Sequence, residues 1–443
     1  MLFAVGLIMR LPFLSLPRQV VFDEIYFCEF ATQYCCGHKN FFDIHPPHAK
    51  LLIAASAKVF GHKSDIQYKN IGQQLDESVA IEGMRLVPAF AGAAIPSIIF
   101  LLVYMLGGSV LSAFLAGFAI CFDNSFIVQS RIVALDPILI FFMLTSVLTC
   151  LRVMRSDIKM DRYFWIALSG MFSAMAVGSK FTGLTAVAIS FGLLGMTAID
   201  KIYANSKMWL DQTKNFAAEM IVFVCGFAVV YLGGWYLHFF LLTETGSGDA
   251  FMLNTGHFFQ DTFKLHKIML SANAGITTPH PYASPWYTWF YLKRPIFYWQ
   301  EAGKVIYFIG NPVVWFSVLP GFVYAVFYWY RNSTSWKERI FDRNLIMILG
   351  AIASIAPMAA VNRPLFLYHY LPTLTFLCIV TFSSFPNWSQ SISPKRKKLY
   401  QGLAVIYVTL ILIGFAIISP LSFGFHAGGS VRSYLQSLYT SWR

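Results

Sequence analysis

The stretch MRLVPAFAGAAIPSIIFLLVYML, residues 84–106, decides the fold. It carries one charged residue, Arg85, next to its start. A helix needs about 20 predominantly apolar residues to cross the hydrocarbon core of a bilayer, and this stretch is long enough. We therefore predict a membrane-spanning helix here.

Ten further apolar stretches extend this pattern along the chain of 443 residues. Hydrophobic residues make up 57% of the sequence, charged residues only 12%, and the mean hydropathy is +0.59. Soluble proteins carry about a quarter charged residues. The sequence thus predicts an all-α integral membrane protein with about eleven transmembrane helices. The other stretches lie near residues 1–16, 109–122, 132–151, 163–179, 182–199, 216–242, 304–330, 344–361, 365–385 and 400–420.

Basic residues cluster in four of the connections between these stretches, near residues 152–162, 201–214, 331–343 and 395–398. When the stretches are counted alternately, all four connections fall on one side, which the positive-inside rule makes cytoplasmic. We expect the N-terminus inside, the C-terminus outside and long outer loops at 17–83 and 243–303. All ten His residues then lie at the outer side. The net charge of +12 follows topology and indicates no nucleic-acid partner.

The chain divides into a catalytic region, 1–242, and an outer loop with four further spans, 243–443. We expect residues 1–16 to be a first span and not a signal peptide, because no small-residue cleavage site follows them. In the first outer loop, Ala49–Phe60 follows two prolines and reads as an amphipathic helix on the membrane surface. The outer cysteines are Cys28, Cys35 and Cys36, and a disulfide among them stays open.

Two adjacent carboxylates, Asp23 and Glu24, follow the first span between apolar and aromatic residues. Burial beside such residues raises the pKa of a carboxyl group and makes it a usable base. The alternative is structural, with Asp23 as the N-cap of a helix. Both roles can hold together.

Five cations are predicted at the outer membrane edge, where an anion is their natural partner. The alternative for each is snorkelling toward lipid headgroups. For Arg131, a local ion pair with Asp123 or Asp136 is a further alternative. The five are Arg85, Arg131, Lys180, Arg294 and Arg363.

A third group begins at His280 and continues through Tyr282 and Trp286 to Trp289, with prolines between them. Aromatic faces stack on sugars and isoprene units, whereas an interfacial aromatic belt would explain the rings alone. Carboxylates, cations and ring platforms on an outer face suit transfer from a phosphate-activated donor. Because nucleotide sugars are cytoplasmic, such a donor has to be carried by a lipid.

These residues resemble the protein O-mannosyltransferase family of membrane glycosyltransferases. The similarity lies in FDEIYF (22–27), FDIHPP (42–47), GMRLVPA (83–89), QSR (129–131) with LDPIL (135–139), the block 280–289, and FLYHYLP (366–372). The resemblance implies a GT-C fold and inverting transfer of mannose from a polyprenyl or dolichyl phosphate to Ser or Thr of a translocated protein, which a translocon would deliver. Asp23 would be the base, Glu24 would position a substrate and Arg85 would contact the donor phosphate.

The resemblance also suggests roles for further residues. Arg131, Lys180, Arg294 and Arg363 would bind the donor phosphate or lipid. Substrate-binding candidates are His45, His48, Asp136, His280, Tyr282, Trp286 and His369. No metal site is expected, and the lipid-linked sugar enters as a substrate; nothing in the sequence supports a divalent metal.

One departure from the family matters, because eukaryotic members carry a soluble module in the loop after span seven. Here that loop holds only a short stretch around His257–Trp299. The chain resembles the compact bacterial type, so the resemblance fixes neither a dolichyl carrier nor a heterodimer partner. A bacterial cell membrane is the expected location, with the ER membrane if the source is eukaryotic. The rival functions are transfer of another lipid-linked sugar to lipid A or an envelope glycan, and secondary transport, whose ionisable residues would lie near the midplane.

Overall fold

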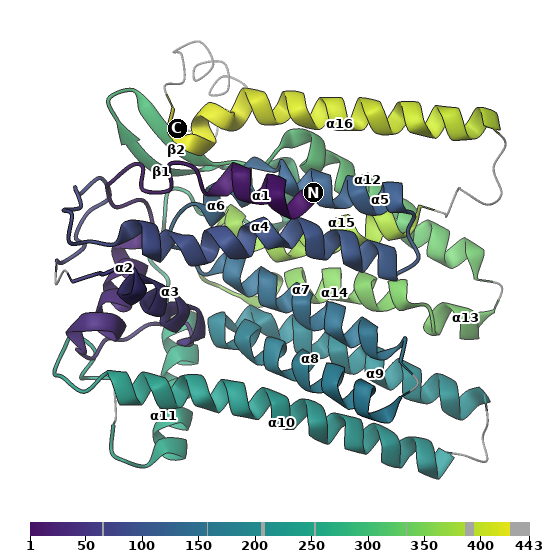
Figure 1. Cartoon of the computed structure of the whole chain (residues 1–443), viewed down its shortest axis with the longest axis horizontal. Helices are drawn as coiled ribbons and strands as arrows, with labels where there is room; N and C mark the ends of the chain where they lie inside the picture. The colour runs from purple at the N-terminus through teal and green to yellow at the C-terminus, as the bar shows by residue number, and fades with distance from the viewer. Residues whose placement is uncertain are drawn as a thin grey trace.

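The computed structural model is a bundle of long helices lying side by side, with short elements gathered at one end (Figure 1). It describes residues 1–63, 66–156, 158–204, 209–251, 254–333, 335–385 and 394–425. The long helices of the bundle are α4 (Ile81–Met105), α5 (Val110–Cys121), α7 (Asp136–Val153), α8 (Lys159–Ser179), α9 (Leu184–Ala204), α10 (Trp209–Leu241), α12 (Pro312–Asn332), α14 (Arg343–Ala360), α15 (Leu371–Ser383) and α16 (Pro394–Phe423).

Seven helices in the described residues are long and apolar enough to cross a membrane, and up to eight if a bent pair counts as one span. The bent pair is α5 with α6 (Asn124–Ser130), which meet at 57°. Each predicted apolar stretch contains a helix, but some helices are too short or too polar to pass on their own. For example, α1 (Leu2–Arg10) ends two residues before Pro12, because a proline disfavours helix in the residue before it. The chain is thus a multi-pass membrane protein, and the count of eleven spans stays a prediction.

One stretch predicted as helix is wrong at its start. Residues 304–308 form strand β2 (Lys304–Phe308), which pairs antiparallel with β1 (Ile296–Glu301). The two central residues of the turn, Ala302 and Gly303, both have positive φ angles of 47° and 79°. Such a two-residue turn matches the right-handed twist of a hairpin. Helix α12 therefore begins only at Pro312.

The short elements at one end of the bundle form the surroundings of the site (Figure 1). They include α2 (Glu24–Thr32), the π-helical turn η1 (Gln33–Gly37), α3 (His48–Val59), α11 (Phe258–Ala274), the 3-10 turn η4 (Trp286–Tyr291) and the hairpin. The short α13 (Trp336–Ile340) lies at the opposite end. The segments between the spans thus assemble into one polar end of the bundle.

The amphipathic helix predicted at Ala49–Phe60 is present as α3, which starts directly after Pro47. Ile53 and Ala57 are buried toward the bundle, whereas Ala55 and Val59 are exposed, as a surface helix requires. Lys50 belongs to the buried residues of α3. Its side chain is only 2% exposed because it forms an ion pair with a carboxylate of the preceding loop.

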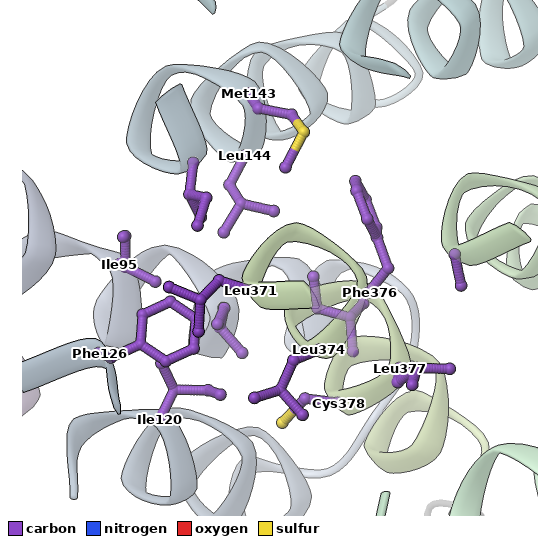
Figure 2. Packing of buried hydrophobic residues seen from close by; sticks show 14 of the residues in the cluster. Ile95, Ile120, Phe126, Met143, Leu144, Leu371, Leu374, Phe376, Leu377 and Cys378 are labelled. Carbon is purple, nitrogen blue, oxygen red and sulfur yellow. The ribbon is translucent and has the colours of Figure 1, made fainter. Parts of the chain in front are cut away.

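The core is centred on α15, a helix in which every residue is buried. Figure 2 shows Leu371, Leu374 and Cys378 of this helix facing Ile120 and Phe126 from the α5–α6 pair. A helix that is apolar on all sides is stable only when protein or lipid surrounds it completely. Helices α4, α5, α7, α12 and α14 all contact α15 and provide this surrounding.

Candidate active site

Asp23 stands at the N-cap position of α2, but its carboxylate accepts no hydrogen bond from the helix. The preceding residue, Phe22, has a positive φ of 49°. Its N–H donates to the carbonyl oxygen of Tyr298 at 3.2 Å, and its ring stacks on the Tyr298 ring at 4.0 Å. The β-hairpin therefore fixes the turn that presents Asp23, and the predicted capping bond is not made.

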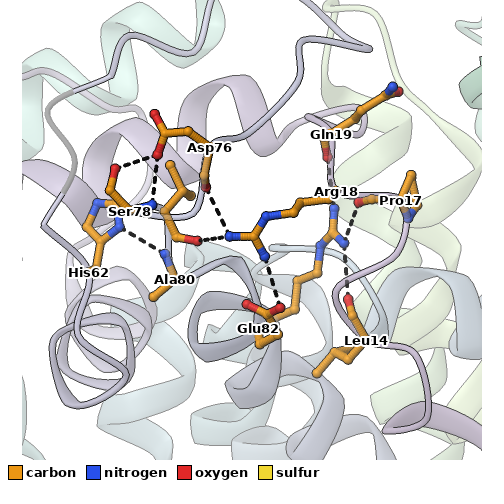
Figure 3. Close-up of polar contacts among 11 residues, drawn as sticks. Leu14, Pro17, Arg18, Gln19, His62, Asp76, Ser78, Ala80 and Glu82 are labelled. Atoms are coloured by element: carbon orange, nitrogen blue, oxygen red, sulfur yellow. Dashed lines mark hydrogen bonds and ion pairs between the residues drawn. The ribbon is translucent and has the colours of Figure 1, made fainter.

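Glu24 and Arg85 form a fully buried ion pair. The Nε and Nη2 atoms of Arg85 donate to the two Glu24 oxygens at 2.7 and 2.8 Å. Arg85 also donates to the carbonyl oxygens of Leu14, Pro17 and Gln19, which Figure 3 shows on one loop beside α4. These five bonds use every N–H group of a guanidinium.

The hydrogen-bonding capacity of the Glu24 carboxylate is also used within the protein. Besides Arg85, it accepts from the backbone N–H groups of Val21 and Val133, each at 2.9 Å. Neither member of the pair has exposed surface or a free hydrogen-bonding group for a ligand. The predictions that Glu24 positions a substrate and that Arg85 contacts the phosphate do not fit this geometry. The pair instead holds the loop after α1, α2, α4 and the segment before α7 together.

Five of the predicted site residues line one cavity of about 70 Å³, although they come from distant parts of the sequence. Two are cations, two are histidines and one is a carboxylate. They are His45, Asp136, Lys180, Arg363 and His369, and the cavity is also lined by Phe181, Thr182, Asn273 and Ser354.

Lys180 is oriented by a chain of hydrogen bonds. Its Nζ donates to Oδ1 of Asp136 at 2.7 Å, and the Nε2 of Gln129 donates to Oδ2 of the same residue at 2.9 Å. The hydroxyl of Tyr298 donates to Oε1 of Gln129 at 2.6 Å. Lys180 also lies 5.4 Å from the ring centroid of Tyr368. The cation is thereby held at the cavity wall from two sides.

Arg363 and His369 form a second cationic corner of the cavity. Arg363 Nη2 lies 3.2 Å from His369 Nε2. The other ring nitrogen, Nδ1, accepts from the Phe366 N–H at 3.0 Å, so the backbone of Phe366 fixes the orientation of the ring. Arg363 keeps further N–H groups that no partner among the described residues occupies.

Asp23 interacts electrostatically with this cavity. The pKa of Asp23 is raised to about 7, chiefly by burial; the charge of Lys180 opposes this rise, and Asp136 and Asp43 contribute to it. Burial and the charge of Lys180 also hold the pKa of His45 well below its usual range. A carboxylate with such a pKa is a usable base near neutral pH, and the neighbouring imidazole is neutral there.

Two site residues were not singled out from the sequence. Asp43 accepts an ion-pair hydrogen bond from Lys50, and Lys50 also donates to the His45 carbonyl oxygen at 2.7 Å. The Lys50 ammonium lies 5.2 Å from the centroid of the Phe30 ring. This pair sets the backbone of His45 at the cavity. One feature of the sequence could have indicated this pair. Asp43 and Lys50 are seven residues apart, in a stretch already noted for its histidines and prolines.

Arg131 and Arg294 do not line the cavity. Arg131 donates to the carbonyl oxygens of Arg10 and Pro12 at 2.8 and 2.9 Å, and it pairs with neither Asp123 nor Asp136. Arg294 is exposed and donates to the Ala283 carbonyl oxygen at 2.9 Å. Both residues fix backbone loops, so their predicted contact with the donor does not fit this structure.

His48 has a packing role. Its ring lies against Gly178 of α8 and Gly234 of α10, where an added Cβ would approach it to 2.2 and 2.4 Å. Its Nε2 hydrogen-bonds the carbonyl of Val230 at 3.1 Å, and burial lowers the pKa of His48 to about 4. A neutral, enclosed ring of this kind joins α3 to two spans and is not placed to touch a substrate.

The remaining candidates, His280, Tyr282 and Trp286, also lie outside the cavity lining. His280 is exposed, and its ring contacts Phe366 edge to face at 5.0 Å. Tyr282 and Trp286 are half-buried and pack against the main hydrophobic core. The His280 ring therefore contacts the segment 363–369, which carries the cationic corner, from outside the cavity.

Among the described residues, one group of neighbouring side chains has the atoms that bind metal ions. It consists of Cys35, Cys36 and His62. The two cysteines are joined as a disulfide, and Cys28 is free and buried. Both His62 nitrogens have partners, since Nδ1 accepts from Ala80 N–H at 3.2 Å and Nε2 contacts Thr32 Oγ1 at 2.9 Å. None of the three lines the cavity.

Comparison with protein-family models gives a match to dolichyl-phosphate-mannose-protein mannosyltransferase over residues 1–243, more than half of the chain. The chain belongs to this family. A second model, the C-terminal four-transmembrane region of protein O-mannosyltransferase, matches residues 258–442. The two matches together cover both the Asp23 end and the segment carrying Arg363.

Curated relatives include protein O-mannosyl-transferase 1 of Danio rerio, 31% identical over 56% of this chain and 35% of the relative. Dolichyl-phosphate-mannose–protein mannosyltransferase 4 of Candida albicans is 31% identical over 56% of this chain and 33% of its own length. The chain thus spans about a third of the length of these curated relatives.

Two solved structures share the fold. The S. cerevisiae protein O-mannosyltransferase Pmt1-Pmt2 complex bound to the sugar donor matches with a TM-score of 0.88 at 17% identity, over 100% of this chain and 92% of that one. ArnT from Cupriavidus metallidurans bound to undecaprenyl phosphate matches with a TM-score of 0.54 at 15% identity, over 91% and 62%. The GT-C membrane fold expected from the sequence is confirmed.

The buried Glu24–Arg85 pair makes a prediction about stability. Glu24→Gln leaves the Arg85 charge buried without a counterion, and such losses typically cost about 3–5 kcal/mol. We expect thermal unfolding of the purified variant in detergent at a clearly lower temperature than that of the parent.

The matched control is Glu82→Gln, which removes the partner of Arg18 in the ion pair drawn in Figure 3. Glu82 is 41% exposed there, and exposed pairs contribute about 0–1 kcal/mol. Equal unfolding temperatures for the two variants would refute the structural role of Glu24.

Proposed function

We propose that this chain transfers mannose from a polyprenyl-type lipid phosphate to Ser or Thr hydroxyls of proteins that cross the membrane. One observation carries the proposal: Asp23, a carboxylate with a raised pKa, interacts electrostatically with Lys180, which lines a cavity together with a second cation, Arg363. Family membership supports mannose as the sugar. The printed names of the relatives support a protein as the acceptor.

In the proposed reaction, the acceptor hydroxyl oxygen attacks the anomeric carbon of the mannose from the side opposite the phosphate. The Asp23 carboxylate takes the hydroxyl proton as the new carbon–oxygen bond forms. The bond from carbon to the phosphate oxygen breaks, and its electron pair leaves with the lipid phosphate. The configuration at the anomeric carbon is therefore inverted.

Lys180 and Arg363 are proposed to neutralise the charge that develops on the departing phosphate. They replace Arg85 and Arg131 in this role because their side chains line the cavity. Asp136 and Gln129 orient Lys180 before the substrate arrives, so little reorganisation is needed during reaction. His45 and His369 are proposed to contact the sugar, since both reach the same cavity.

The site is proposed to face away from the cytoplasm. Two of the connections rich in basic residues join α7 to α8 and α12 to α14, at the end of the bundle opposite α2 and α3 (Figure 1). The positive-inside rule then makes the Asp23 end external, either periplasmic in a bacterial cell membrane or lumenal in the ER. A lipid-carried donor is the kind of activated sugar available on that face.

Asp23→Asn is expected to lower the rate of mannose transfer by about 10²–10⁴-fold, because an amide cannot take the hydroxyl proton. The measurement is transfer of labelled mannose from polyprenyl-phosphate-mannose to a Ser/Thr peptide by purified protein. The control is Glu29→Gln, further along α2, whose carboxylate bonds only Gln33 among the described residues. Near-normal turnover in Asp23→Asn would remove the base assignment.

The pH dependence should follow the ionisation of Asp23. Its pKa is raised to about 7, so the protonated, inactive form dominates below that pH. We expect kcat/KM for the peptide to fall about tenfold per pH unit below 7 and to level off above it. A profile flat from pH 5 to 7 would show that no group of this pKa acts as the base.

Lys180→Gln should mainly impair use of the donor. Removing a charged hydrogen bond to a phosphate typically costs about 1.5–3 kcal/mol, or roughly 10–150-fold in kcat/KM. We expect this loss in the donor titration, with Lys58→Gln on the exposed side of α3 unchanged. A donor dependence equal to that of the parent would take Lys180 out of the phosphate site. If another lipid-linked sugar or a lipid acceptor reacts faster in the same assay, the substrate proposal falls while the site proposal stands.

A further inference from the structure

A large groove lies between α16 and the rest of the bundle, away from the catalytic cavity. It has a volume of about 810 Å³ and is walled by α5, α12 and α15 on one side and by the first half of α16 on the other. Most of its lining is apolar or aromatic, including Leu115, Tyr324, Phe382 and Ala404. The catalytic role described above uses none of these residues.

Hydrogen bonds tie the second half of α16 to the bundle. Asn311 Nδ2 donates to the Ile411 carbonyl oxygen at 2.9 Å, and Asn124 Nδ2 donates to Ser422 Oγ at 2.8 Å. Tyr407 hydrogen-bonds Ser317 at 2.9 Å. Before Tyr407, α16 forms one wall of the groove.

The wall behind the groove is closely packed. An added Cβ on Gly321 of α12 would come within 2.3 Å of Thr381 on α15. These two helices are therefore in direct contact and cannot part to absorb the first half of α16. In a bilayer, a groove of this kind that opens to lipid is filled by hydrocarbon chains.

One end of the groove is cationic. Lys397 is part of the lining. Across the groove, Arg155 donates to the Met105 carbonyl oxygen at 3.2 Å, next to the lining residue Tyr104. No carboxylate belongs to the described lining. Positive charge at the mouth of an apolar slot complements a lipid with an anionic headgroup.

The occupant is distinct from the sugar donor. The groove lies at the C-terminal end of α4 and the N-terminal ends of α5 and α16, whereas α2 and α3 lie at the other end of the bundle (Figure 1). A lipid whose phosphate sits at Lys397 belongs to the opposite leaflet from one whose phosphate sits at Lys180. We propose that this groove binds one acyl chain of an anionic glycerophospholipid, with its headgroup beside Lys397.

The test uses the full-length protein extracted from vesicles containing equal parts of phosphatidylglycerol and phosphatidylcholine. Native mass spectrometry then counts the lipids that stay bound. We expect retention of phosphatidylglycerol over phosphatidylcholine. Ala404→Phe, which fills the groove, should abolish it, and Lys397→Gln should lower the preference about fivefold, the effect of one lysine beside an anionic headgroup.

Two neighbours serve as matched controls. Val405→Phe adds the same ring on an exposed part of α16 outside the groove, and Lys398→Gln removes the adjacent charge that is not in the lining. Both should retain lipid as the parent does, and Lys397→Gln keeps the test valid if Ala404→Phe fails to fold. Equal retention of the two phospholipids, or equal losses in variants and controls, would overturn the proposal. So would retention of added undecaprenyl phosphate in place of phosphatidylglycerol, or a bound second polypeptide that Ala404→Phe removes.

Discussion

The buried ion pair between Glu24 and Arg85 is the interaction on which the polar end of the molecule depends. It joins four segments that are far apart in the sequence, because each partner also bonds backbone groups of other segments. Burying two charges is costly unless their remaining hydrogen-bonding groups are satisfied, and here they all are. Asp23 is the residue next to Glu24, so its position is set by a neighbour that cannot move.

The two carboxylates therefore divide the work between them. Glu24 accepts four hydrogen bonds and has a structural role. Asp23 accepts none from α2 and interacts with the charges of the cavity. The sequence shows two acidic residues side by side, and nothing in their spacing tells which one is satisfied. The same holds for the cations. Arg85 lies at the start of a predicted span and Lys180 lies between two of them, and only the fold shows that Arg85 is enclosed while Lys180 lines a cavity.

The sequence predicts the helices that correspond to long apolar stretches. Long stretches such as 84–106 became helices because a buried or lipid-facing backbone has to satisfy its own hydrogen bonds. The hairpin was not predicted, because its sequence lacks the pattern that usually identifies a strand. Ile296–Phe308 is aromatic and apolar on both faces, so it shows no alternation, and its only signal was Ala302-Gly303 at the turn. Tyr298 of this hairpin contacts both Phe22 and Gln129. Because the hairpin was not predicted, these contacts of the site could not be predicted either.

Helix α15 has a consequence for assembly in the membrane. It is buried on every side, yet it follows α4, α5, α7, α12 and α14 along the chain. During synthesis these earlier helices enter the bilayer first, and the space that α15 fills is then open to lipid. The bundle consequently cannot close from its N-terminal end onward. Its final packing waits for a late helix to displace lipid from the centre of the bundle.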